Sequence, residues 1–177
     1  AQQNASVAYR AEELESIQIQ GVTERYLELS TFDAERGRMV SPIEISRSRP
    51  VALIGWQIAD RLFGSEDPVD KTIKVAGVPF RVVGVSAKKG SFFGNSLDEF
   101  VVIPLGKYQK LFGSRQSLSL LVKPRDPLVV SMARDEARTA LRVSRHLAPG
   151  DDDNFGIVAS DSILDIFQQA TTGIAVV

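Results

Sequence analysis

Alternating and helically spaced apolar positions along the chain predict a mixture of short strands and helices. Segments 5–10 and 15–20 each alternate in part between apolar and polar residues and flank a polar turn, which indicates a hairpin. Ile17 and Ile19 would lie on one face of it. Thr23 is suited to cap a short helix that follows. The chain is therefore expected to open with a hairpin and a helical turn.

The central block, residues 50–94, has the most informative pattern, because a strand, a helix, an acidic turn, a hairpin and a glycine-bounded loop follow one another. Residues 51–55 read as a short apolar strand. Residues 56–64 place four apolar side chains on one helical face, namely Ile58, Ala59, Leu62 and Phe63. Gly64 is suited to the position just past the helix end. A strand–helix unit is therefore predicted here.

The same block also predicts a second hairpin. Two β-rich runs, 71–75 and 79–86, are joined through Ala76-Gly77-Val78, which is typical of a tight turn. The core candidates of the second run are Phe80, Val82 and Val85. Gly84 is expected to mark a bulge or a close packing contact.

Beyond the central block the pattern alternates between strands and helices. Residues 100–105 and 117–123 read as strands. The clearest helix spans residues 128–147, and its expected buried stripe is Val130, Ala133, Ala137, Ala140, Leu141 and Leu147. A strand at 155–159 and a helix at 163–169 complete the prediction. Together these elements predict an α+β fold.

Composition narrows the class of protein without pointing to a chemistry. The chain has 177 residues, of which 44% are hydrophobic and 24% charged, as in ordinary globular proteins. Its formal net charge of −1 gives no electrostatic argument for binding nucleic acid or an anionic membrane. The sequence has no cysteine, which excludes disulfides, thiol nucleophiles and thiolate metal sites.

The two ends of the sequence leave two interpretations open. It begins with AQQNASV and ends with the apolar run GIAVV, and no stretch reaches the roughly 20 apolar residues of a membrane span. The chain is expected to be either a soluble piece of a longer membrane protein or a domain whose last helical turn is apolar.

No catalytic, cofactor-binding or metal-binding residues are predicted. His146 is the only histidine and falls at the end of a basic helix, so a hydrolase triad built on it has little support. Adjacent carboxylates occur at Glu12-Glu13, Glu66-Asp67 and Asp98-Glu99, all in predicted turns. We interpret these carboxylates as solvated turn residues rather than as acid–base pairs.

A stripe of basic residues recurs along the helix predicted at 128–147. It consists of Arg134, Arg138, Arg142 and Arg145. Such a stripe would either touch nucleic acid or phospholipid headgroups or form the solvated face of an amphipathic helix. The adjacent acidic residues Asp135 and Glu136, together with the net charge near zero, favour the solvated face.

Residues 88–94, KKGSFFG, form the loop for which a contact with another protein is predicted. Two adjacent aromatic residues cannot both point inward from an extended strand, so one is expected to be exposed unless the loop folds over it. The candidate partner-contact residues are Lys88, Lys89, Phe92 and Phe93. Packing within the loop is the alternative interpretation.

Several segments, taken in order, carry a resemblance to a known family. They are GVTERYLEL (21–29), VALIGWQIADRLFG (51–64), EDPV with KTI (66–73), GVPFRVVGV (77–85), KKGSFFG (88–94), VVIPL (101–105), the strand–helix pair at 117–147, and DNFGIVASDSILDIFQQAT (153–171). In their order and spacing they resemble the extracytoplasmic domain of MacB-type ABC transporter permeases. The resemblance covers nearly the whole chain.

This resemblance implies a fold of two lobes. A Porter-like lobe of strand–helix–strand units is expected from residues 1–49 and 114–177, with a Sabre-like mixed α/β lobe inserted into it at 50–113. The family's usual opening strand and helix are not found before the first hairpin, so that unit either lies upstream or is missing. The family usually has Gly where this chain has Asp70, which would place a turn with positive φ on a residue that tolerates it less well.

The resemblance also implies a function. The domain would lie outside the inner membrane, between two membrane helices of a permease, with no catalytic site or cofactor of its own. ATP would be bound by a cytoplasmic ATPase domain or subunit, and a second permease copy would complete a homodimer. The relative motion of the two outer domains would expel or release a substrate. A periplasmic adaptor and an outer-membrane channel are further expected partners, and nucleic acid is not.

One alternative of a different class is a free-standing secreted protein-binding module, which would have its own signal peptide and no flanking membrane helices. A hydrolase would lose activity when His146 is mutated. A nucleic-acid-binding protein would show a steep salt dependence of binding. No pattern in the sequence indicates which substrate a transporter would carry.

Overall fold

The computed structural model describes residues 1–29, 33–92, 94–124 and 126–158, and the chain divides into two compact units, Ala1–Leu121 and Val122–Val177. The strands of the first unit are β1 (Gln2–Tyr9), β2 (Glu12–Val22), β3 (Ala34–Gly37), β4 (Val51–Ile54), β5 (Thr72–Val75), β6 (Val78–Ser86), β7 (Ser91–Phe92), β8 (Asn95–Ser96) and β9 (Phe100–Pro104). Its helices are α1 (Glu24–Leu29), α2 (Pro42–Ser46), α3 (Trp56–Phe63) and α4 (Leu105–Phe112). The second unit contains the 3₁₀ turn η1 (Pro127–Val129) and α5 (Val130–Ser144).

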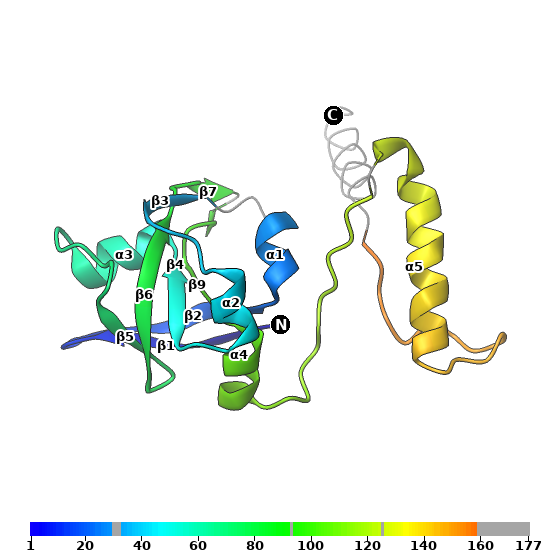
Figure 1. Cartoon of the computed structure of the whole chain (residues 1–177), viewed down its shortest axis with the longest axis horizontal. Helices are drawn as coiled ribbons and strands as arrows, with labels where there is room; N and C mark the ends of the chain where they lie inside the picture. The colour runs from blue at the N-terminus through cyan, green and yellow to red at the C-terminus, as the bar shows by residue number, and fades with distance from the viewer. Residues whose placement is uncertain (30–32, 93, 125, 159–177) are drawn as a thin grey trace, which may run out of the picture. The chain divides into compact units, whose positions relative to one another are not determined.

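The first unit is organised around a mixed sheet of seven strands in the order β3-β6-β4-β9-β2-β1-β5 (Figure 1). β5 pairs with β1, where Val75 lies opposite Val7, and also with β6, where Ile73 lies opposite Phe80. The sheet therefore closes on itself as a barrel, and β3 lies outside the ring, paired only with β6 among the described strands. The two predicted hairpins, β1–β2 and β5–β6, are both confirmed.

The barrel strands alternate between an inner and an outer apolar cluster. Along β4, Ala52 and Ile54 belong to the inner cluster, whereas Val51 and Leu53 belong to the outer one. Both faces of β4 are buried, which explains why this strand reads as an unbroken apolar run rather than as an alternating one. α3 closes the inner cluster with the four side chains predicted for it, Ile58, Ala59, Leu62 and Phe63.

The outer cluster is covered by the segment that contains α2. This helix forms because Pro42 occupies its first turn and Ser41 and Glu44 make a capping box, in which each side chain bonds the other residue's backbone N–H. Ile45 of α2 and the preceding Val40 are buried against strand residues of the cluster. Figure 1 shows α1 and α2 on the opposite side of the sheet from α3.

Glycine has a steric role at the point where β3 approaches β6. A Cβ on Gly84 would lie 2.2 Å from the carbonyl oxygen of Arg38. The close packing predicted at this glycine is therefore confirmed. The register of β6 against β4 also shifts here, between Ala52 and Leu53.

Asp70 has the left-handed backbone conformation that the family resemblance implies for its position, with φ of 65°. A short polar side chain tolerates this conformation, whereas a β-branched residue does not. We expect Asp70→Val to lower the free energy of unfolding by about 1–2 kcal/mol, while Asp70→Asn and Asp70→Gly change it by less than about 0.5 kcal/mol. Urea unfolding of the three variants measures the difference. Equal losses of unfolding free energy in Asp70→Val and Asp70→Asn would show that backbone conformation does not restrict the residue type at this position.

Three predictions about the later part of the chain are wrong. Residues 117–123 form no strand, and no residue of α5 is buried in the structure. Five members of the predicted stripe are half-buried and Ala140 is exposed. A strand needs a neighbour for its backbone hydrogen bonds, and among the described residues none pairs with 117–123. Residues 155–158 are likewise not a strand, and the predicted helix at 163–169 lies outside the described residues.

The chain has an α+β fold, but its compact units do not follow the predicted lobe boundaries. β1 and β2, from residues 1–49, share one sheet with β4, β5, β6 and β9, from residues 50–113. The reason is the parallel pairing of β2 with β9, which joins residues 18–22 to 100–104. The assignment of Porter-like and Sabre-like lobes to particular residues stays a prediction. Within the described part of the chain, no helix has the length and apolar character of a membrane span.

Candidate partner-contact site

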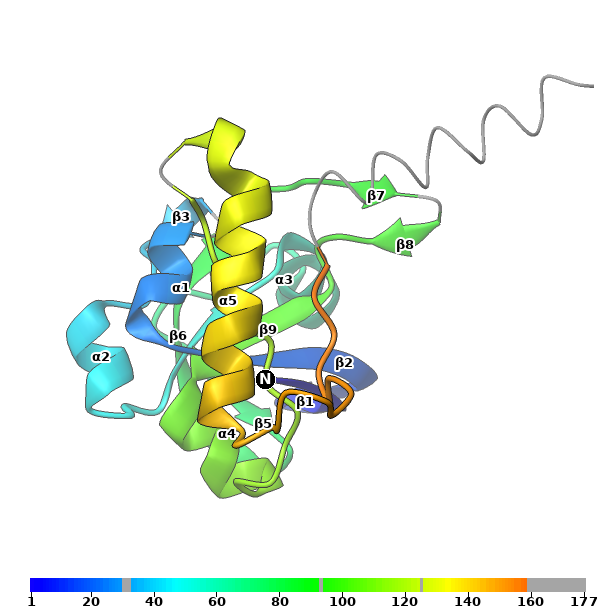
Figure 2. The same ribbon diagram turned by 90° about the vertical axis from the view of Figure 1, so that its right-hand side faces the viewer.

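The loop singled out by the sequence forms an arm that leaves the barrel between β6 and β9. We call residues 88–92 and 94–97 the contact arm. Its strands β7 and β8 pair with each other and not with the barrel sheet, with Ser91 opposite Ser96. Figure 2 shows them extending away from the barrel strands. The arm is therefore a small hairpin held at its base.

The base of the contact arm is fastened by a buried carboxylate. Asp98 is only 2% exposed. Its Oδ1 accepts a hydrogen bond from the backbone N–H of Lys89 at 2.8 Å, and its Oδ2 accepts one from the backbone N–H of Gly90 at 2.7 Å. The N–H of Leu97 donates to the carbonyl of Gly90 at 2.9 Å. Hydrogen bonds to a charged acceptor are stronger than neutral ones, so these contacts fix where the arm begins.

The same aspartate joins the arm to the first turn of α3. Its backbone carbonyl accepts a hydrogen bond from the N–H of Gln57 at 3.2 Å, and its own N–H donates to Ser96 Oγ at 3.1 Å. That hydroxyl in turn donates to Gln57 Oε1. Gly55 permits the approach, because a Cβ there would lie 2.1 Å from the Asp98 carbonyl oxygen. The arm base and the start of α3 are thus joined by backbone and side-chain bonds.

The structure describes two of the four predicted contact residues fully, one in part and one not at all. Lys88 is exposed and its Nζ lies 3.9 Å from the centroid of the Trp56 ring, a cation–π contact to α3. Lys89 is also exposed. Phe92 belongs to β7, but its side chain is not described, and Phe93 lies outside the described residues. The structure therefore brings Lys88 to Trp56 and leaves the contact role of all four residues a prediction.

Two carboxylates that the sequence indicated as solvated are held by hydrogen bonds or ion pairs to other segments of the folded chain. Asp98 is buried, because the fold brings backbone N–H groups from eight and nine residues earlier within its reach. Glu66 bonds Arg10 at 2.9 Å and Lys71 at 3.1 Å, which joins the β1–β2 turn to the segment before β5. The hydrogen bond from Lys71 is the main reason that the pKa of Glu66 is lowered. No local signal in the sequence separates these carboxylates from exposed ones.

The arginine stripe on α5 holds a neighbouring segment of the second unit. Arg138 Nε and Arg142 Nη1 lie 2.5 Å and 2.6 Å from the two carboxylate oxygens of Asp153. Arg145 Nη1 donates to Asn154 Oδ1 at 2.9 Å. The pKa of Asp153 is lowered chiefly by the hydrogen bond from Arg138. These arginines are therefore engaged within the chain, which corrects the view of them as a purely solvated face and weakens their use for nucleic acid.

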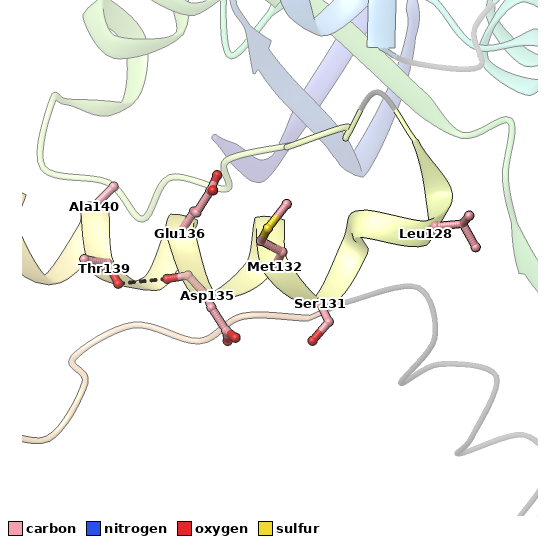
Figure 3. Close-up of a pocket in the computed structure, with 7 residues that line it drawn as sticks. All are labelled: Leu128, Ser131, Met132, Asp135, Glu136, Thr139 and Ala140. Atoms are coloured by element: carbon pink, nitrogen blue, oxygen red, sulfur yellow. Dashed lines mark hydrogen bonds between the residues drawn. The ribbon is translucent and has the colours of Figure 1, made fainter.

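The other features that could indicate chemistry are isolated. His146 is exposed and follows the end of α5. In the described part of the chain, no group of three or more His, Cys, Asp or Glu side chains could hold a metal ion. An open hollow of about 770 Å³ runs along one face of α5, where Thr139 Oγ1 bonds the Asp135 carbonyl (Figure 3). Its lining residues come only from η1 and α5, namely Leu128, Ser131, Met132, Asp135, Glu136, Thr139 and Ala140. A hollow lined by one helix does not surround a ligand.

Comparison with known proteins identifies the type of domain. The model of the MacB-like periplasmic core domain matches residues 1–140. A macrolide export ATP-binding/permease protein MacB from Chlorobaculum tepidum is 31% identical over 143 residues, which are 80% of this chain and 22% of that protein. The MacB protein of Neisseria meningitidis serogroup A is 29% identical over 167 residues, 94% of this chain and 25% of that protein. The chain thus spans about a quarter or less of these curated relatives.

Solved structures show the same fold. The periplasmic region of MacB from Actinobacillus actinomycetemcomitans superposes with a TM-score of 0.74 at 18% identity, covering 95% of this chain and 73% of that one. The extracellular domain of the noncanonic ABC-type transporter YknZ from Gram-positive bacteria gives a TM-score of 0.72 at 20% identity, covering 82% and 73%. The fold and the family match agree over most of the described residues, and the chain belongs to the family of MacB-like periplasmic core domains.

Proposed function

We propose that this chain is the extracytoplasmic domain of an ABC transporter permease, which transmits an ATP-driven conformational change and contacts a protein partner outside the inner membrane. The observation that carries the proposal is the family match over residues 1–140. The curated relatives are named as ATP-binding/permease proteins, so the ATPase and membrane parts would lie in the portion of such a protein that this chain does not span. A second permease copy would complete the transporter.

The geometry of the first unit supports a mechanical role. A barrel closed by hydrogen bonds around its ring leaves no open edge at which its strands could separate, so we expect it to move as one body. The contact arm is attached to this body at two places, through Asp98 and through Gln57 of α3. A displacement of the barrel would therefore carry the arm with it, toward or away from a partner.

The motion can be measured in the full-length permease. This chain has no cysteine, so in a permease whose remaining cysteines are replaced, Ser91→Cys introduces one thiol on the exposed face of β7 in each copy of the domain. Spin labels on the two copies are expected to change their mean separation when ATP and vanadate are added. The same labels on Gln3→Cys in β1 report whether the whole barrel moves. Unchanged separations at both sites would contradict the proposed transmission.

The same variant tests the partner contact. A benzophenone maleimide on Ser91→Cys should crosslink an adaptor protein encoded beside the permease gene, whereas the label on Gln3→Cys should not. Equal capture from both sites would count against a contact through the arm. The complete reading frame provides a second test: absence of membrane helices flanking the domain would favour a free-standing secreted binding module instead.

A further inference from the structure

We infer that Asp98 is the positioning residue of the contact arm and that it fixes the arm and the first turn of α3 as a single unit. The inference rests on the proposed function, because a fixed arm pose matters when the arm meets a partner. Asp98 is a buried carboxylate with no part in the inner apolar cluster. Its hydrogen bonds within the described part of the chain join it to the arm or to α3.

The carboxylate accepts hydrogen bonds from two backbone donors of the arm. The N–H groups of Lys89 and Gly90 are consecutive, and each is bonded by a different oxygen of Asp98. In this geometry each N–H has its own acceptor oxygen, which the two oxygens of aspartate supply and the single amide oxygen of asparagine does not. An amide at this position would place its NH₂ group against one of the two donors.

The backbone of Asp98 extends this connection to α3. Its carbonyl accepts from Gln57, its N–H donates to Ser96, and Ser96 donates to Gln57. Lys88 adds a contact from the other end of the arm, because its ammonium group lies over the Trp56 ring. The first end of the arm therefore contacts Trp56 and the second end contacts Gln57, and these two residues are adjacent at the start of α3.

The neighbouring carboxylate provides a matched control. Glu99 forms an ion pair with Arg61, which also belongs to α3, but among the described residues it makes no hydrogen bond to the arm backbone, and its side chain is 32% exposed. If any carboxylate beside the arm base were sufficient, Glu99→Gln and Asp98→Asn would act alike. If the position of the arm depends on the hydrogen bonds from the two backbone donors, only Asp98→Asn should increase hydrogen exchange in the arm.

The test uses the 177-residue chain, with hydrogen exchange and tryptophan fluorescence as readouts. In Asp98→Asn, hydrogen exchange at the Lys89, Gly90 and Leu97 amides is expected to become about ten- to hundredfold faster. This factor corresponds to the loss of one hydrogen bond to a charged group. Amides of β4 and β9 should keep their protection. Trp56 is the only tryptophan, so its acrylamide quenching should increase as Lys88 leaves the ring. Ser96→Ala, which keeps the carboxylate, should raise arm exchange only about threefold.

Three outcomes would overturn the inference: an equal rise at the barrel amides, no rise at the arm amides, or the same arm exchange in Glu99→Gln as in Asp98→Asn. The result is separable from the proposed function. An arm released in Asp98→Asn whose crosslinking to the adaptor is undiminished supports the positioning role and shows that the partner contact does not depend on the pose of the arm. An intact arm that never crosslinks overturns the contact alone.

Discussion

Gly55→Ala is expected to lower the free energy of unfolding by about 2–3 kcal/mol, because the added methyl group has no space. A Cβ at this position would lie 2.1 Å from the carbonyl oxygen of Asp98 and 2.7 Å from its carbonyl carbon. Both atoms belong to backbone, which cannot rotate away as a side chain would. The N–H of Gly55 also bonds the carbonyl of Phe100 at 2.8 Å, so the clash must displace β9, the arm base or α3.

Urea unfolding of Gly55→Ala measures this loss, and hydrogen exchange locates it. We expect the Lys89 and Gly90 amides to lose protection together with the β4–β9 pairing, unlike the local effect of Asp98→Asn. Gly156→Ala is a suitable control, because a Cβ there meets nothing within 4 Å. A Gly55→Ala variant as stable as that control would show that the strand–helix junction adapts and that the close approach is not needed.

Glu44→Gln is expected to remove about 1–2 kcal/mol of stability at pH 7 and to flatten the acid side of the pH–stability curve. Glu44 accepts hydrogen bonds from the guanidinium of Arg38 at 2.7 Å through both oxygens and from Ser41 N at 2.9 Å. These contacts lower its pKa from 4.5 to about 2, with the Arg38 bond as the largest cause. The expected energy is below the full value of that shift because the Arg38 side chain is half exposed and screened.

The direction of the pH effect follows from the order of protonation. As the pH falls, the unfolded chain takes up the Glu44 proton near pH 4.5, whereas the folded chain resists until about pH 2. The stabilisation is therefore complete above about pH 5 and is lost between about pH 5 and pH 2. Gln keeps the capping box but carries no charge, so its curve should lack this step.

Thermal unfolding of the two proteins between pH 2 and pH 7 checks this expectation. Glu12→Gln, at an exposed position of β2, serves as the control for removing one carboxylate. If Glu44→Gln retains the step of the natural sequence in that range, the acid sensitivity of the domain arises elsewhere. The ionic contact would then matter only for holding α2 on the outer cluster.

Much of the first unit could be predicted from the sequence because its signals are local. Alternation in 15–20 identified the buried Ile17 and Ile19, and the helical spacing in 56–64 identified the four buried residues of α3. The turn at 76–77 depends only on two neighbouring residues with positive φ, Ala76 and Gly77. Patterns of this kind report which face of an element is buried, and they need no knowledge of what covers it.

The later part of the chain was predicted less well, because local patterns do not show which segment will cover or pair with an element. Residues 117–123 alternate like a strand, yet an extended segment becomes a strand only when a neighbour pairs with its backbone. The apolar stripe of α5 has the correct spacing, yet its residues are at most half-buried. Periodicity indicates a capacity for burial, and only the arrangement of other segments decides whether burial occurs.

By itself the sequence determined most strands and helices of the first unit, though not β3, α2, β7 or β8. It also determined the family resemblance, which the match over residues 1–140 confirmed, and the loop at 88–94 as the place to look for a contact. Only the tertiary structure decided that the strands close into a barrel and that Asp98, indicated as a solvated turn residue, is the buried anchor of the contact arm. The physical reason is distance along the chain. A carboxylate is stabilised in a buried site by donors that the fold brings to it, and neither the backbone donors of Lys89 and Gly90 nor the approach of Gly55 can be recognised from residues adjacent to Asp98.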